Sequence, residues 1–263
     1  MEDTCGNVTC EFEHGLSIYV ETKTHKLLVD TGASNKTITN AEKLGIDLSK
    51  VDTVILSHGH YDHSGGILPF YKINSEAIIY MQKSALLDYY HGEKYIGIDK
   101  DIAELSNVRL LGGGCEIDEE ISIFTNITGR RYWPKSNMSL SIKEGKQNIQ
   151  DNFSHEQCIV IHDKKEILIS GCAHNGILNI LDRYKEIYCG TPDIVISGFH
   201  MTKKTDYTAE EIETIGQTAK ELVQYNTIFY TGHCTGQRAI DIMKPIMKDK
   251  LIQIHCGMDV VSE

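Results

Sequence analysis

Four side chains of the kind that bind metal ions fall within six consecutive positions: His58, His60, Asp62 and His63. They follow an apolar run at residues 54–56, which predicts a short buried strand. Imidazoles and a carboxylate this close together are poorly solvated unless a cation lies between them, and a divalent metal ion is the usual one. In an extended segment His58 and His60 point the same way, whereas Asp62 and His63 can face a second point. The segment therefore predicts ligands for two ions about 3.5–4 Å apart.

The same segment contains three glycines, Gly59, Gly65 and Gly66. We expect them to supply the free backbone angles that a loop wrapped around metal ions needs. The alternative is a surface loop with incidental histidines, and that alternative does not account for the glycines.

The pattern HxHxDH after an apolar strand resembles the metallo-β-lactamase superfamily, and the resemblance extends through most of the chain. Within the superfamily, the chain is similar to a branch of metal-dependent hydrolases related to the archaeal dihydropterin–ribofuranosylaminobenzene phosphate synthases. Six segments carry this finer placement: EHGLS (13–17), LVDTG (28–32), SHGHYDHSGG (57–66), SGCAHNGILNI (170–180), SGFHM (197–201) and TGHCTG (231–236).

Composition and charge narrow the classes of partner. The chain has 263 residues, of which 41% are hydrophobic and 24% charged, as in ordinary globular proteins. Its net charge of −11 and the absence of a basic run argue against nucleic acid as a partner. No stretch approaches the roughly 20 apolar residues of a membrane span. We therefore expect a small-molecule substrate, which can still be phosphorylated, and the sequence leaves the oligomeric state open.

The eight cysteines are scattered and lack the paired spacing of a zinc ribbon. The first ten residues, MEDTCGNVTC, also lack the basic and apolar regions of a signal peptide. Both features favour a cytoplasmic protein with reduced thiols.

Apolar runs and turn residues predict two β-rich halves, each flanked by helices. In the first half, strands are predicted at residues 16–20, 26–29, 54–56, 77–81 and 108–111, and helices at 35–44, 67–71 and 84–90, the last with Ser84 as a possible N-cap. In the second half, strands are predicted at 121–124, 140–142, 158–162, 167–170, 194–197, 228–231 and 251–255, and helices at 176–184, 209–225 and 237–247. This order predicts an α/β protein, an αβ/βα four-layer sandwich with two central mixed β-sheets flanked by helices. No linker divides the halves, so we expect one metallo-β-lactamase-like domain over residues 1–263.

The remaining metal ligands are expected at strand ends elsewhere in the chain. His174 and His233 each lie just past a predicted strand, in a turn that contains glycine. We assign His58, His60 and His174 to one ion, and Asp62, His63 and His233 to the other. The alternative for each late histidine is a hydrogen-bonded residue of the core or of a turn.

Three further positions leave alternatives open. Many superfamily members place an aspartate after a strand that ends in glycine, but here that position is Cys172, which is either a thiolate ligand or a small buried side chain. His155 precedes a strand where other branches supply a histidine, and it competes with His174. By resemblance, Asp30 holds a ligand histidine or a metal-bound water in orientation; otherwise it caps a turn.

Two histidines are candidates for contact with the substrate. His200 either contacts the substrate, stabilises a developing oxyanion or packs as a structural residue. His14 precedes the first strand and could line the entrance of the pocket.

A hydrolase is the first function that this site predicts. Two divalent ions, zinc being the best match and iron, manganese and nickel being compatible, would generate a hydroxide that attacks a small ester or phosphoester. Asp62 would both bind an ion and orient that hydroxide. The alternative implied by the resemblance is a transferase that joins a dihydropterin diphosphate to a ribofuranosylaminobenzene phosphate, with the metals binding and releasing diphosphate. A redox or binding protein is a third class. A diiron oxidoreductase of this superfamily would carry a flavin or rubredoxin module, and we expect none within residues 1–263.

Overall fold

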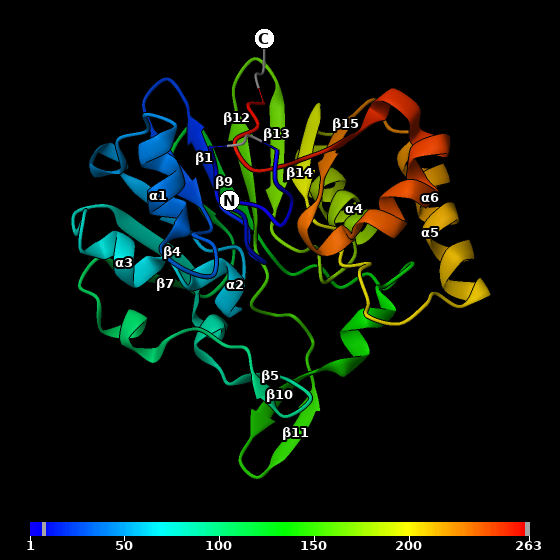
Figure 1. The fold of residues 1–263 in the computed structure, drawn as a ribbon, viewed down its shortest axis with the longest axis horizontal. Helices are drawn as coiled ribbons and strands as arrows, with labels where there is room; N and C mark the ends of the chain where they lie inside the picture. The colour runs from blue at the N-terminus through cyan, green and yellow to red at the C-terminus, as the bar shows by residue number, and fades with distance from the viewer. Residues whose placement is uncertain (7–8, 261–263) are drawn as a thin grey trace.

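The computed structural model describes residues 1–6 and 9–260. Within them two mixed β-sheets face each other, and helices cover the outer side of each sheet (Figure 1). The longer helices are α1 (Lys36–Lys43), α3 (Ile67–Tyr71), α4 (Ile177–Tyr188), α5 (Ala209–Leu222) and α6 (Gln237–Met247). α1 and α3 pack on the first sheet, and α4, α5 and α6 pack on the second. The predicted αβ/βα sandwich is confirmed.

The first sheet has the strand order β1-β2-β3-β4-β7. Its strands are β1 (Ile18–Glu21), β2 (Lys26–Val29), β3 (Thr53–Ile55), β4 (Ile78–Gln82) and β7 (Val108–Leu111). β1 and β2 form an antiparallel hairpin, whereas β2, β3, β4 and β7 run parallel to one another. The residues that follow β2 and β3 therefore emerge at the same edge of the sheet.

The second sheet has the strand order β16-β15-β14-β13-β12-β9-β8. Its strands are β8 (Cys115–Glu116), β9 (Ile121–Phe124), β12 (Cys158–His162), β13 (Glu166–Ser170), β14 (Ile194–Ser197), β15 (Ile228–Thr231) and β16 (Leu251–Gln253). β13, β14, β15 and β16 run parallel. The turns after β13, β14 and β15 therefore also lie along one edge.

Apolar side chains on both faces of each sheet hold the layers together. In β12, Ile159 and Ile161 pack between the two sheets, whereas Val160 packs against the helices of the second sheet. Such strands are buried on both faces and are apolar at nearly every position, which is why the sequence located most of them. No helix within residues 1–6 and 9–260 has the length and apolar character needed to cross a membrane.

A third, smaller sheet was not predicted. It has the order β11-β10-β5-β6 and extends away from the sandwich (Figure 1). Its strands are β5 (Tyr89–His91), β6 (Lys94–Tyr95), β10 (Leu140–Glu144) and β11 (Gln147–Gln150). The helix predicted at residues 84–90 is wrong, because only a short 3₁₀ turn, η2 (Lys83–Leu86), forms there and Tyr89 pairs with Ile142 of β10. A partner strand about fifty residues away overrides the local helical preference of this segment.

His25 links the two large sheets. It lies in the turn between β1 and β2, and its ring is hydrogen-bonded to Asp52, just before β3, and to Asp118, between β8 and β9. Burial by itself lowers the pKa of His25, but the two carboxylates outweigh that effect and raise the pKa above its ordinary value. The protonated ring therefore stabilises the contact between the sheets.

We expect His25→Gln to lower the free energy of unfolding by about 0.5 kcal/mol at about pH 6 and by less at about pH 9. A histidine whose pKa is raised on folding stabilises the native state below the unfolded-state pKa of about 6.5, and this stabilisation is lost as the pH rises through the folded-state pKa. Urea unfolding of wild type and variant at both pH values measures the difference. The control is His91→Gln, at an exposed position. A deficit that is larger at the higher pH would contradict the link.

Candidate metal centre

The predicted ligands converge where parallel strands of both sheets end. His58 and His60 follow β3, His174 follows β13 and His233 follows β15. Ligand sites of α/β proteins typically lie outside the carboxyl ends of such strands. The structure thus brings together residues that are far apart in the sequence, since His58 and His233 are 175 positions apart. Asp62 and His63 lie in the same cluster as the two late histidines.

His58, His60 and His174 form one group. Their possible ligand atoms lie within 4.8 Å of one another, and all three residues are buried. The Nε2 atoms of His58 and His174 are 3.3 Å apart. Burial, followed by the neighbouring histidines, holds the pKa of each of the three rings well below the ordinary value. The rings are therefore neutral and keep lone pairs for a metal ion.

Hydrogen bonds to the far side of two rings fix where their lone pairs point. Asn137 donates its Nδ2–H to the backbone oxygen of His174, so its Oδ1, 3.0 Å from Nδ1 of that ring, accepts the Nδ1–H. The Ser57 hydroxyl donates to Asp30, and its oxygen, 2.9 Å from His58 Nδ1, accepts the His58 Nδ1–H. Both Nε2 atoms thus carry lone pairs that face each other. Such an arrangement repels unless a cation lies between the rings.

His60 supports the same conclusion. Its Nε2 atom is buried and has no hydrogen-bond partner among the described residues. A buried polar atom without a partner is unfavourable. A divalent metal ion held with His58 and His174 would satisfy it, so this group of side chains fits the ions that the sequence predicts.

Asp62, His63 and His233 form the second group. Asp62 Oδ2 lies 3.7 Å from His63 Nε2 and 3.5 Å from His233 Nε2, and the two Nε2 atoms are 3.2 Å apart. Burial alone raises the pKa of Asp62, but the histidines hold it well below the usual range. Burial lowers the pKa of His233, yet its hydrogen bonds to Asp3 and Asp62 raise it overall. A proton and a metal ion therefore compete for this place.

Asp30 orients rings of both groups. Its Oδ2 accepts the His63 Nδ1–H at 2.6 Å and the Ser57 hydroxyl hydrogen at 2.7 Å, and its Oδ1 accepts the Ser57 backbone N–H. Through Ser57 the same carboxylate sets the orientation of His58. The position matches the orienting role that the resemblance implies for Asp30, and the residue is completely buried.

Cys172 lies between the two groups. Its Sγ is 3.2 Å from His63 Nε2, and it forms a potential ligand set with His58 and His63. Burial raises the pKa of its thiol, so a thiolate here requires a cation in contact. Cys172 thus points its side chain at the cluster.

His155 lies beside the first group but uses both ring nitrogens elsewhere. Its Nδ1 accepts the Gly59 backbone N–H at 2.8 Å, and its Nε2 is 3.2 Å from Asp151 Oδ2. His155 forms a further potential ligand set with His60 and Asp151. His174, in contrast, directs a free lone pair at His58, which favours His174 as the third ligand.

The turn that carries His174 is held by a buried carboxylate, that of Glu156. Glu156 accepts the backbone N–H of His174 at 2.5 Å and that of Asn175 at 2.9 Å. Burial raises the pKa of Glu156. Both oxygens are occupied by this turn, so Glu156 supports the site from behind.

Several residues of the site have left-handed backbone conformations. Asp30, Ala173, His200 and His233 have φ values of 60°, 52°, 48° and 46°. Non-glycine residues seldom adopt this region, and such strain concentrates at functional sites. Each of the four lies shortly after a strand end, where the sharp turn directs the neighbouring side chains into the cluster.

The glycines of the early histidine segment have a different role from the one predicted. Gly65 and Gly66 have φ values of −63° and −84°, which any residue can adopt. A Cβ atom added at Gly59 would lie 2.7 Å from the Ala85 backbone oxygen. One added at Gly65 would lie 2.1 Å from the Ala33 backbone oxygen, and one added at Gly66 would lie 2.2 Å from the Thr31 backbone oxygen. The segment therefore needs glycine for close backbone packing, and the expectation of unusual backbone angles is wrong.

Two acidic residues near the start of the chain were missed. Glu2 Oε1 accepts the His233 backbone N–H at 2.5 Å, and Asp3 Oδ1 accepts its Nδ1–H at 2.7 Å. No spacing pattern in the sequence connects positions 2 and 3 with position 233. His14 lies 2.7 Å from Asp3 Oδ2 and 3.3 Å from Asp62 Oδ2, with its side chain 52% exposed. His14 thus lies at the solvent-exposed rim of the second group.

His200 lies next to the first group. Its ring centre is 4.1 Å from that of His174, and its Nδ1 is buried without a hydrogen-bond partner among the described residues. The Ser136 hydroxyl donates to its backbone oxygen at 2.5 Å. This nitrogen is thus available to a ligand beside the centre.

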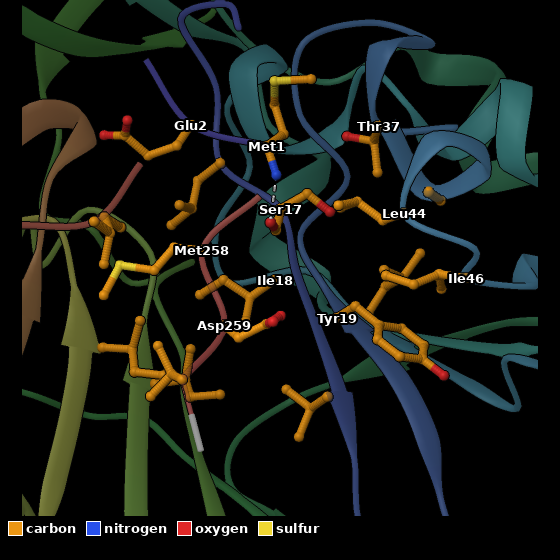
Figure 2. Close-up of a pocket in the computed structure, with 18 of the residues that line it drawn as sticks. Met1, Glu2, Ser17, Ile18, Tyr19, Thr37, Leu44, Ile46, Met258 and Asp259 are labelled. Atoms are coloured by element: carbon orange, nitrogen blue, oxygen red, sulfur yellow. Dashed lines mark hydrogen bonds between the residues drawn. The ribbon is translucent and has the colours of Figure 1, made fainter. Parts of the chain in front are cut away.

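A separate cavity of about 360 Å³ lies behind the N-terminal segment (Figure 2). Ile18, Leu44 and Ile46 are among its mainly apolar lining side chains. None of the clustered histidines lines it. Glu2 borders this cavity on one side and holds His233 on the other. The chemistry therefore belongs to the histidine cluster and not to this larger space.

Comparison with known proteins identifies the family. Residues 11–126 match the metallo-beta-lactamase superfamily. The chain is 32% identical to Tm1679, a metal-dependent hydrolase of the β-lactamase superfamily, with a TM-score of 0.82 over 100% of this chain and 97% of that one. The chain belongs to the metallo-β-lactamase superfamily. Members of this superfamily are typically metal-dependent hydrolases that use divalent metals.

Two relatives within the superfamily come from Methanocaldococcus jannaschii. The 7,8-dihydropterin-6-methyl-4-(beta-D-ribofuranosyl)-aminobenzene-5'-phosphate synthase is 27% identical over 274 residues, which span 93% of this chain and 88% of the synthase. The uncharacterized protein MJ0448 is 29% identical over 235 residues, which span 87% of this chain and 86% of that protein. The relation to the synthases that the sequence motifs indicated is confirmed.

Substitution of Asp30 and substitution of Asp3, the two carboxylates that orient ligand histidines, should affect the two groups differently. With an ion in each group, as the sequence predicts, we expect Asp30→Asn to weaken metal binding by roughly 10- to 100-fold at both groups, because Asp30 orients rings of both. Asp3→Asn should weaken one ion only, because Asp3 holds His233 alone among these ligands. Competition with a chromophoric chelator measures both affinities.

The matched control for these variants is Asp101→Asn, at an exposed position in the 3₁₀ helix η3 (Lys100–Glu104). It should leave both affinities unchanged. Equal metal binding by Asp30→Asn and wild type would show that Asp30 does not orient the ligands.

Proposed function

We propose that this protein is a dinuclear-metal hydrolase that acts on a small ester or phosphoester. The observation that carries the proposal is the pair of facing lone pairs on His58 and His174, with the unpartnered nitrogen of His60 beside them. Neutral, preoriented imidazoles are the ligands that a divalent metal ion such as zinc takes in a buried site. The eight free cysteines of the chain fit the reducing cytoplasm as its location.

In this proposal, one ion is held by His58, His60 and His174. The other is held by Asp62, His63 and His233, and Cys172 is positioned to contact it. Imidazole-rich sites suit zinc, while iron, manganese and nickel match the same ligand types.

Two bound divalent ions would lower the pKa of a water ligand to near neutrality and polarise the oxygen of the scissile group. Asp62 Oδ2, which faces both His63 and His233, would orient the attacking water. His200 Nδ1, buried and unpartnered among the described residues, would meet the oxygen that gains negative charge. Burial of the cluster excludes bulk water and strengthens these interactions.

The number of metal ions per chain, compared between wild type and variants of each ligand group, tests the proposal. We expect about two metal ions per chain in wild type, and about one in His60→Ala and in His233→Ala, since each removes a ligand of one group. Elemental analysis measures the content. His162→Ala is the control, because His162 is bound to Ser122 and Glu166 away from the cluster. Full metal content in both variants would refute the dinuclear site.

Activity is tested with a panel of phosphodiester, thioester and lactone substrates. We expect Asp62→Ala to lower kcat at least roughly 100-fold, because it removes both a ligand and the group that orients the water. Retention of activity would remove Asp62 from the mechanism.

A second candidate is a pterin-condensing transferase, which the relationship to the Methanocaldococcus jannaschii synthase over 93% of this chain favours. In that case the ions would bind diphosphate and assist its release from a dihydropterin diphosphate, and a ribofuranosylaminobenzene phosphate would be the acceptor. Product analysis with both substrates distinguishes the two functions, because only the transferase forms a joined product.

A further inference from the structure

A second pocket, of about 240 Å³, lies beside the candidate metal centre. Its walls are the segment around η4 (Lys135–Ser139), the turn after β14 and the start of α5. The lining includes five aromatic or sulfur-containing side chains: Tyr132, Trp133, Met138, Met201 and Tyr207. In Figure 1 the green segment before β10 and the yellow segment that leads into α5 border this region.

The pocket is joined to the metal centre through His200. This histidine lines the pocket, and its ring lies 4.1 Å from that of His174. Two adjacent residues of η4 hold the two histidines: Ser136, which lines the pocket, donates to the His200 backbone oxygen, and the buried Asn137 donates to the His174 backbone oxygen. A molecule in the pocket therefore contacts the histidine that lies next to the first group, whereas the proposed metal ligands themselves do not line the pocket.

Two lining residues have buried polar atoms without a partner. Trp133 Nε1 and His200 Nδ1 have no hydrogen-bond partner among the described residues. The indole nitrogen is a donor only, so it requires an acceptor. Buried tryptophan N–H groups usually have such a partner, which indicates that a ligand supplies the acceptor here.

The positive charges of the pocket are already neutralised. Lys203 Nζ lies 2.8 Å from both carboxylate oxygens of Glu211, and Lys135 Nζ lies 2.6 Å from Glu210. Neither lysine is free to bind a phosphate. Aromatic walls with paired charges favour a neutral, flat ligand that stacks on them.

We propose that this pocket binds a neutral, planar aromatic ring of the substrate through an acceptor atom at Trp133 Nε1. The ring places the bond to be cleaved next to His200 and the histidine cluster. The pocket is smaller than the roughly 300–1,000 Å³ of a complete ligand site, so it holds one part of the substrate. This inference deepens the proposed function and rests on it for the identity of the reacting group.

The single tryptophan provides a direct test, because Trp133 is the only one in the chain. The protein as purified is titrated with 4-quinazolinone, a neutral planar ring with a carbonyl acceptor, while tryptophan emission and, in parallel, calorimetric heat are recorded. We expect a saturable change in emission and matching heat. Cyclohexanecarboxamide and inorganic phosphate should give neither. No saturable binding of quinazolinone, or equal binding of phosphate, would overturn the proposal.

Variants of Tyr207 locate the binding. Its hydroxyl donates to the Met201 backbone oxygen at 2.8 Å. We expect Tyr207→Ala to weaken quinazolinone binding at least 10-fold and Tyr207→Phe, which keeps the ring, to bind as wild type does. Equal weakening in both would assign the effect to the lost hydrogen bond and contradict ring stacking.

The titration is repeated after the metal ions are removed with a chelator, which separates this inference from the proposed function. One outcome is that the ring still binds after chelation while the metal-loaded protein hydrolyses no substrate of the panel. This outcome supports the aromatic pocket and counts against the hydrolase. Hydrolysis of a panel substrate without any ring binding supports the hydrolase and refutes the aromatic pocket.

Discussion

One buried carboxylate determines how two of the clustered histidines, His58 and His63, present their lone pairs. Asp30 accepts hydrogen bonds from His63 and from Ser57, and Ser57 in turn accepts one from His58. The Nδ1 atoms of His58 and His63 are thereby occupied, and their Nε2 atoms face those of His174 and His233. Because neutral lone pairs at this separation repel, the arrangement is stable only around a cation. The rest of the site depends on this constraint.

The two sheets are required to build that arrangement. Parallel strands of the first sheet deliver Asp30 and the early histidine segment, and parallel strands of the second deliver His174, His200 and His233. The apolar layer between the sheets fixes their separation. Strained turns at the strand ends then direct the side chains inward. Packing energy of the core thus holds polar groups in a geometry that they would not adopt alone.

The functional groups are divided between two neighbouring places. The histidine cluster offers chemistry that is indifferent to the shape of the substrate, since it acts on one polarised bond. The proposed aromatic pocket beside His200 would select the substrate by the shape of its ring and would take no part in the reaction. A shared scaffold that carries different sites explains how one superfamily serves several reactions.

The sequence by itself determined the early histidine segment, the strands with apolar runs and the late histidines at strand ends, because each depends on residues within a few positions of one another. Only the tertiary structure decided that His174 rather than His155 directs a free lone pair at His58, that Glu2 and Asp3 hold His233, and that Tyr89 enters a strand. The glycines around the histidines likewise proved to serve close packing. These features depend on contacts between segments far apart in the chain. A local sequence pattern does not determine which distant segment packs against it.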